Sequence, residues 1–189
     1  DIRFNTEIND LGILRGYDEI IVATGAVPRK MLIPGFEKCL TFTQLLREKY
    51  PVGDKVVFFG GGQSACEAAY EMVLQGKHPI IVEYAKDLVP AQNVCLSNAS
   101  FLRDVLEYHK VPTYLEHTIR EIKDKTVVIA SKDGKNVFEV EYDNIVNGIG
   151  FVPAPVGGKG KNIHRVGDCV TIGNLRTVIW RAWDVCMKI

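Results

Sequence analysis

Six consecutive residues near the middle of the chain have the spacing of a phosphate-binding turn. The hexapeptide Gly60-Gly61-Gly62-Gln63-Ser64-Ala65 fits the pattern G-x-G-x-x-G/A. The first glycine permits a tight strand-to-helix turn, and the second, Gly62, removes a side chain where a pyrophosphate approaches the backbone. The third position, Ala65, must be small so that helix and strand pack closely. Together with the N–H groups of Gln63 and Ser64 at the helix start, the turn predicts a site for the phosphates of a dinucleotide.

Two glutamates extend this candidate site. Glu83 ends the next strand-like segment, 23 residues beyond Gly60, where a carboxylate can accept hydrogen bonds from the adenosine ribose. The alternative is a purely structural turn with a solvated Glu83. Glu67 lies on the predicted helix and has two interpretations: it faces the nicotinamide end of the cofactor, or it is a solvated glutamate favoured by the helix dipole.

The predicted elements place the turn between a strand and a helix. The apolar run "KVVFF" (55–59) indicates a strand buried on both faces of a parallel sheet, and apolar spacing over 63–75 indicates a helix that stops at Gly76. "PIIVE" (79–83) is a second buried strand. The remaining predictions are a helix around 101–106 capped by Ser97 or Asn98, a hairpin turning at 132–135, strands at 19–23, 144–150 and 163–168, and a helix over 175–189.

The composition of the chain limits the kinds of partner that we expect. Hydrophobic residues make up 47% of the chain and the net formal charge is zero, which suits a soluble globular protein and predicts neither nucleic acid nor a membrane as partner. The cysteines are scattered without a CxxC pair, and the histidines lack metal-ligand spacing, so we predict no metal site and a cytoplasmic protein. Cys66 and Cys169 are expected to be structural thiols. Residues 153–162 are glycine-rich and are either an ordinary surface loop or an altered connection.

Three further segments carry a family resemblance. "VATGAVPR" (22–29) and "VNGIGFVPA" (146–154) each run from a strand into Gly-x-x-Pro, and "VGDC" (166–169) closes a late strand. With the glycine turn, this order resembles the two-dinucleotide-binding-domain flavoproteins, the class that includes the disulfide reductases. The resemblance implies an NAD(P)H domain inserted into a flavin domain. It assigns Gly25, Gly167 and Asp168 to the FAD side and Gly150 to the NADH side.

A narrower resemblance covers residues 17 to 189. The segments "YDEIIVATGAVPRKMLIPGF", "KVVFFGGGQSACEAAYEMVLQGKHPIIVE" and "HRVGDCV" are similar to the C-terminal region of NADH:flavin oxidoreductases related to old yellow enzyme, the group of 2-enoate reductase and 2,4-dienoyl-CoA reductase. In that group NADH reduces FAD, and electrons pass through a 4Fe–4S centre to FMN and an activated alkene. The barrel that holds FMN, the cluster cysteines and the first turn of the flavin domain have no counterpart in these residues, so the resemblance implies a fragment that partners with those segments.

The expected architecture is therefore α/β, with a Rossmann-like NADH-binding domain of parallel strands and a β-meander. We assign residues 1–50 to the first part of a flavin-type domain, 51–152 to the NADH-binding domain and 153–189 to a return to the flavin-type domain. The expected function is to bind NADH and present its hydride to FAD. The alternative is a module that holds ADP or NAD without transferring anything.

Overall fold

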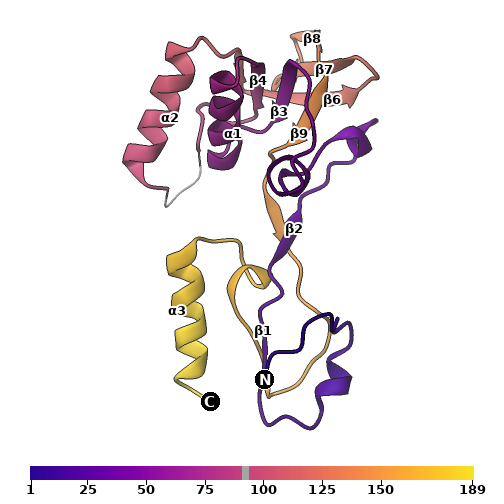
Figure 1. Cartoon of the computed structure of the whole chain (residues 1–189), viewed down its shortest axis with the longest axis vertical. Helices are drawn as coiled ribbons and strands as arrows, with labels where there is room; N and C mark the ends of the chain where they lie inside the picture. Colours follow the sequence, from indigo (N-terminus) through magenta and orange to yellow (C-terminus); the bar gives the residue numbers. More distant parts are fainter. Residues whose placement is uncertain (91–93) are drawn as a thin grey trace. The chain divides into compact units, whose positions relative to one another are not determined.

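The computed structural model describes residues 1–90 and 94–189 and divides the chain into two compact units (Figure 1). The discontinuous unit comprises residues 1–29 and 151–189, and the central unit comprises residues 30–150. Among the residues described, no helix has both the length and the apolar character needed to cross a membrane. The assignment of the units to a flavin and to NADH, with the boundaries at 50/51 and 152/153, stays a prediction.

A four-stranded parallel sheet forms the middle of the central unit. Its strands are β3 (Lys55–Phe59), β4 (His78–Glu83), β5 (Thr113–Leu115) and β9 (Asn144–Asn147), in the order β5-β4-β3-β9. Each neighbouring pair runs parallel. The sequence predicts β3, β4 and β9, but not β5, because the run "TYL" is not continuously apolar and is not followed by glycine.

Both faces of this sheet are covered, as the continuous apolar run of β3 predicts. Val56 and Phe58 belong to the cluster that packs against the helices, whereas Val57 and Phe59 belong to the cluster that packs against a second, antiparallel sheet. Figure 1 shows the helices on one side of the parallel sheet and the second sheet on the other. The covering elements are α1 (Gln63–Leu74), α2 (Leu96–Tyr108), β6 (His117–Ile122), β7 (Thr126–Ser131) and β8 (Val137–Glu141). This confirms the predicted α/β fold class.

The second sheet contains the predicted hairpin. β7 pairs with both β6 and β8, and Ala130 lies opposite Val137 across the turn. Gly134 supplies the left-handed residue of that turn with φ of 74°. β6 is absent from the sequence prediction because its run, "HTIREI", mixes charged and apolar residues, and its pairing shifts register between Ile119 and Glu121.

The N-cap prediction for the second helix is wrong. The sequence favours Ser97 or Asn98, but α2 begins at Leu96 with Cys95 as its N-cap and without a side-chain capping bond. Ser97 instead places its hydroxyl 3.1 Å from the Cys95 Sγ atom, inside the first turn. The helix therefore starts about one turn before its apolar periodicity becomes visible.

The discontinuous unit is built from two short strand pairs. β1 (Ile20–Val22) pairs in parallel with β11 (Ile163–Arg165), and β2 (Ala26–Pro28) pairs antiparallel with β10 (Phe151–Pro153). β11 is shorter than the predicted strand at 163–168 because a left-handed Gly167, with φ of 71°, follows it. The small core of the discontinuous unit contains Leu11, Ile20, Val22 and Cys169. The connection from β10 to β11, which includes residues 154–160, is irregular.

One long helix and four short helical turns complete the structure over residues 1–90 and 94–189. α3 (Leu175–Cys186) begins with a capping box between Asn174 and Thr177, ends slightly before the predicted 189 and has no buried residue. The tryptophans on this helix, Trp180 and Trp183, are 59% and 57% exposed, so they are not core residues. The short elements are η1 (Leu11–Leu14), η2 (Phe36–Lys38), η3 (Thr43–Arg47) and η4 (Gly167–Cys169).

Candidate nucleotide-binding site

The first glycine of the turn is required by its backbone. Gly60 follows β3 with φ of 108°, a conformation that side chains disfavour, and its N–H donates to the Val82 carbonyl at 2.8 Å. A Cβ atom at this position would lie 2.5 Å from the carbonyl oxygen of Gly148. The chain thus passes directly from β3 into the turn only because residue 60 lacks a side chain.

The second glycine is required for a different reason. Gly62 is the N-cap of α1 and has ordinary extended dihedral angles, φ of −69° and ψ of 173°. A Cβ atom there would meet nothing within 4 Å, so the space in front of the helix start is open. The first N–H groups of α1, from Gln63 to Ala65, have no acceptor inside the helix. Open space, free donors and the positive end of the helix dipole suit an anionic phosphate.

The small third position closes the turn against the neighbouring strand. Ala65 is 1% exposed, and a Cβ atom placed on Gly148 would lie 3.1 Å from the Ala65 Cβ atom. The N–H of Gly148 donates to the Phe59 carbonyl at 2.8 Å. Gly148 is therefore a necessary partner of the turn that sequence reasoning missed. The segment "NGIG" (147–150) shows that glycines follow the strand, but the sequence alone does not show which of the two glycines contacts the turn.

Glu83 is buried and its carboxylate is fixed beside the turn. The residue is 9% exposed. Its Oε2 atom accepts a hydrogen bond from the Gly61 N–H at 2.6 Å, and its Oε1 atom accepts one from the Ala85 N–H, also at 2.6 Å. A carboxylate has about four acceptor positions, so each oxygen retains capacity for a further donor. The arrangement excludes the interpretation of Glu83 as a solvated residue.

The middle glycine of the turn has a role that the sequence pattern does not specify. Gly61 donates to Glu83, and its carbonyl accepts from the N–H of Val89 at 2.8 Å. A Cβ atom on Gly61 would lie 2.6 Å from the Cδ2 atom of Leu88 and 3.1 Å from the Glu83 Cβ atom. Because Gly61 has no side chain, the loop after β4 can approach the turn. The Gly61 N–H then holds the Glu83 carboxylate in place.

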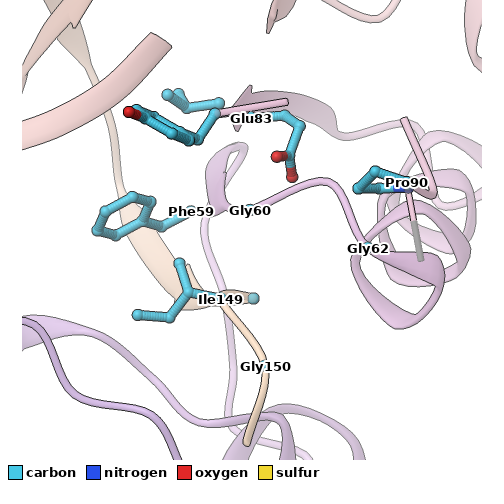
Figure 2. Close-up of a pocket in the computed structure, with 10 residues that line it drawn as sticks. Phe59, Gly60, Gly62, Glu83, Pro90, Ile149 and Gly150 are labelled. Carbon is cyan, nitrogen blue, oxygen red and sulfur yellow. The ribbon is translucent and has the colours of Figure 1, made fainter. Parts of the chain in front are cut away.

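One cavity of about 380 Å³ lies at the carboxyl ends of β3, β4 and β9 and is bordered by Gly60, Gly62 and Glu83. Figure 2 shows the Glu83 carboxylate on one side of this space and Ile149 and Gly150 on another. A cavity at this edge of a parallel sheet is where open α/β folds bind ligands. The lining residues are Phe59, Gly60, Gly62, Val82, Glu83, Tyr84, Pro90, Gly148, Ile149 and Gly150.

The structure does not bring Glu67 to this cavity. Glu67 is exposed on α1, and its Oε1 atom accepts a hydrogen bond from the Gln63 Nε2 atom at 2.7 Å. It lines a separate cavity of about 280 Å³ together with Tyr70, Asn98 and Phe101. Of the two interpretations of Glu67, the geometry favours an exposed helix residue.

The residues expected on the flavin side lie in the discontinuous unit. Gly25 follows β1 and Gly167 follows β11, both with positive φ, of 73° and 71°. The Asp168 Oδ1 atom accepts from the Gly173 N–H at 3.0 Å, which orders the loop before α3. Because β1 and β11 are parallel neighbours, the three residues gather at one edge of this small sheet. Their assignment to FAD stays a prediction.

The cysteines of the core behave as structural groups. Burial raises the pKa of the Cys66 thiol to about 12, and its Sγ atom donates to the Gly61 carbonyl at 3.4 Å. The Cys169 thiol is buried and bonds to the carbonyls of Val22 and Val166. A thiol with so high a pKa carries almost no thiolate at neutral pH, so Cys66 is unsuited to redox exchange. Over residues 1–90 and 94–189, no three His, Cys, Asp or Glu side chains are grouped as metal ligands.

A parallel sheet with a glycine turn between its strand β3 and the helix α1 is typical of the Rossmann-type dinucleotide-binding fold. The chain matches the pyridine nucleotide-disulphide oxidoreductase family over residues 11–185, and it belongs to that family. The cofactors of this family are FAD and NAD(P)H, which confirms the expected cofactors at the family level.

Individual relatives point to a narrower group. The chain is 29% identical over 180 residues to cinnamate reductase of Clostridium sporogenes, which covers 92% of the chain and 27% of that protein. It is 28% identical over 162 residues to nitrite reductase [NAD(P)H] of Bacillus subtilis, covering 81% of the chain and 20% of that protein. The chain thus spans about a quarter of the length of these curated relatives. The similarity to cinnamate reductase supports the resemblance to two-domain flavoproteins of the enoate reductase type.

Solved structures agree with this placement. A 2-naphthoyl-CoA reductase in complex with 2-naphthoyl-CoA superposes with a TM-score of 0.75 at 27% identity, covering 89% of this chain and 26% of that one. The thioredoxin reductase of T. acidophilum superposes with a TM-score of 0.65 at 17% identity, covering 89% of this chain and 62% of that one. The second likeness shows the fold alone, and it confirms the Rossmann-type architecture.

Proposed function

We propose that the central unit binds NADH in the cavity beside Gly60, with the pyrophosphate at the start of α1 and the adenosine ribose on Glu83. The observation that carries this proposal is the pairing of an open Gly62 with a buried, oriented carboxylate in one cavity. Neither feature is needed for a turn that only connects a strand to a helix. Together they match the two ends of a ribose pyrophosphate.

The residues present fit the proposed ligand chemically. The pyrophosphate is negative and meets backbone donors at the start of α1, whereas the neutral ribose hydroxyls meet an acceptor. Ile149 and Gly150 border the cavity after β9, and Phe59 lies beside them (Figure 2). This apolar side suits the uncharged reduced nicotinamide ring. The chain's own contribution is therefore to bind the dinucleotide, orient it and exclude water from part of it.

The hydride acceptor in this proposal is FAD, held by a flavin-type domain to which the discontinuous unit contributes Gly25, Gly167 and Asp168. Family membership supports the pairing of FAD with NAD(P)H. The similarity to cinnamate reductase and 2-naphthoyl-CoA reductase supports an activated alkene or an aromatic acyl-CoA as the final electron acceptor of the parent protein. FMN and a 4Fe–4S centre would be held by other segments of that parent.

The preference for NADH over NADPH tests the role of Glu83. A 2′-phosphate would face the Glu83 carboxylate inside a partly dry cavity, so its negative charge is disfavoured. Hydrogen bonds to charged groups contribute about 1.5–3 kcal/mol, which corresponds to a preference of roughly tenfold to a hundredfold for NADH. Calorimetric titration with both cofactors measures this ratio directly.

The variant Glu83→Gln is expected to reduce the preference for NADH over NADPH. Its amide oxygen can accept from only one of the two N–H groups, of Gly61 and Ala85, and the ribose loses an ionic acceptor. Glu71→Gln is the matched control, because Glu71 is exposed on α1 and bonds to Gln75 away from the cavity. Equal or tighter binding of NADPH by the unmodified chain would show that the carboxylate does not face the ribose.

A module that holds a nucleotide without transferring a hydride is the alternative. Stopped-flow mixing of NADH with the flavin-loaded parent protein separates the two functions. Bleaching of the oxidised flavin absorption under anaerobic conditions supports hydride transfer. Tight NADH binding with no change in flavin absorption would leave only the holding function.

A further inference from the structure

A lysine from a distant turn lies over a tyrosine at the rim of the cavity. Tyr84 follows Glu83, lines the cavity and keeps 55% of its surface exposed. The Nζ atom of Lys132 lies 4.4 Å from the centroid of the Tyr84 ring, within the range of a cation–π interaction. Lys132 belongs to the turn between β7 and β8, far along the chain, so nothing in the sequence links the two residues.

Backbone hydrogen bonds fix this turn beside the end of β4. The Lys132 N–H donates to the Glu116 carbonyl at 2.7 Å, and the Glu116 N–H donates to the Ala85 carbonyl at 2.9 Å. The residue after Tyr84 is thus tied through Glu116 to Lys132. The Ala85 N–H in turn donates to Glu83, so the tyrosine is held between two anchored residues. These backbone hydrogen bonds bring the two residues side by side, and their exposed side chains then make the contact between the ammonium group and the ring.

We propose that the Tyr84 ring, held in position by Lys132, is the surface on which the adenine of the bound nucleotide stacks. This inference rests on the proposed function, because the ribose on Glu83 places the base beside the next residue along the chain. An exposed aromatic ring at a cavity rim offers a nucleobase a stacking partner without demanding any particular base edge. The ammonium restricts the ring to one orientation, so less conformational freedom is lost when the base binds.

Calorimetric titration with ADP-ribose tests the tyrosine, because this probe carries the adenine but lacks the nicotinamide. Tyr84→Ala is expected to weaken ADP-ribose binding about tenfold or more, whereas Tyr84→Phe stays within about twofold of the unmodified chain. Reduced nicotinamide mononucleotide, which lacks adenosine, is expected to bind both variants and the unmodified chain equally. Unchanged ADP-ribose affinity in Tyr84→Ala, with circular dichroism showing a folded chain, would overturn the proposal.

A double-variant cycle tests whether Lys132 acts through Tyr84. Lys132→Met keeps the aliphatic stem and removes the charge, and we expect it to weaken ADP-ribose binding about twofold to fivefold. The same change in a Tyr84→Ala background is expected to have no further effect. Lys132→Arg keeps the positive charge and is expected to bind ADP-ribose as the unmodified chain does. Lys86→Met serves as the control, because Lys86 is an exposed lysine two residues after Tyr84.

The possible failures are distinguishable. An equal effect of Lys132→Met with and without Tyr84 would contradict a role as positioning residue. An effect confined to 2′-phospho-ADP-ribose would instead assign Lys132 to phosphate recognition and would also overturn the proposal. If the unmodified chain bound neither NADH nor ADP-ribose, the proposed function itself would fail and this inference with it. Normal NADH binding combined with an unaffected Tyr84→Ala variant would overturn this inference alone.

Discussion

Replacing Gly62 with valine is expected to weaken NADH binding by about a hundredfold or more while the fold survives. The valine side chain would enter the open space before α1, where a Cβ atom meets no protein atom within 4 Å. It would thereby block the approach of the pyrophosphate to the helix N–H groups, and two or more charge-assisted hydrogen bonds of about 1.5–3 kcal/mol each would be lost. The dihedral angles of residue 62 are ordinary, so the substitution adds no backbone strain.

The matched control is Gly16→Val. Gly16 also has nothing within 4 Å of its added Cβ atom, but it lies in the discontinuous unit, away from the cavity lining. Isothermal calorimetry with NADH reports the affinity of both variants, and circular dichroism reports their folding. Unchanged NADH affinity in a folded Gly62→Val chain would place the nucleotide elsewhere.

Replacing Gly60 with alanine is expected to damage stability rather than binding alone. The added Cβ atom would lie 2.5 Å from the Gly148 carbonyl oxygen, which is backbone and cannot swing away, and φ is 108°. Strain at a positive φ costs about 1–3 kcal/mol, and forced contact in a packed region costs about as much again. We therefore expect the free energy of unfolding of the central unit to fall by about 2–6 kcal/mol.

Gly62→Ala is the control for this second prediction, because it adds the same methyl group two residues away into open space. Urea unfolding followed by circular dichroism compares the two variants with the unmodified chain. A Gly60→Ala chain as stable as Gly62→Ala would show that the turn has a different conformation from the one described.

The sequence was sufficient for elements with long apolar runs. β3, α1 and β4 lie where "KVVFF", the helical spacing after Gln63 and "PIIVE" predict them, because each buries a continuous apolar surface. The glycine turn followed from the same reasoning, since it must join β3 to α1. β5 and β10 were not recognised, although β1 and β11 are equally short, because neither is part of an apolar run that ends in glycine.

The residues of the candidate site that the sequence did not predict depend on contacts between distant parts of the chain. Gly148 matters because its backbone touches Gly60 and Ala65, and Lys132 matters because a hairpin turn is tied to the end of β4. Neither contact leaves a local pattern in the sequence. Glu83 was identified from its spacing, but its bonds to Gly61 and Ala85 require the folded chain.

Amide chemical shifts of the isotope-labelled chain during an NADH titration test the central claim most directly. If the nucleotide binds in the cavity beside the glycine turn, the N–H signals of Gly60, Gly61 and Gly62 shift together and saturate with one affinity. Signals of Gly25 and Gly167 in the discontinuous unit stay in place. Shifts confined to those two glycines, or to Lys77 and His78 at the amino end of β4, would contradict the account.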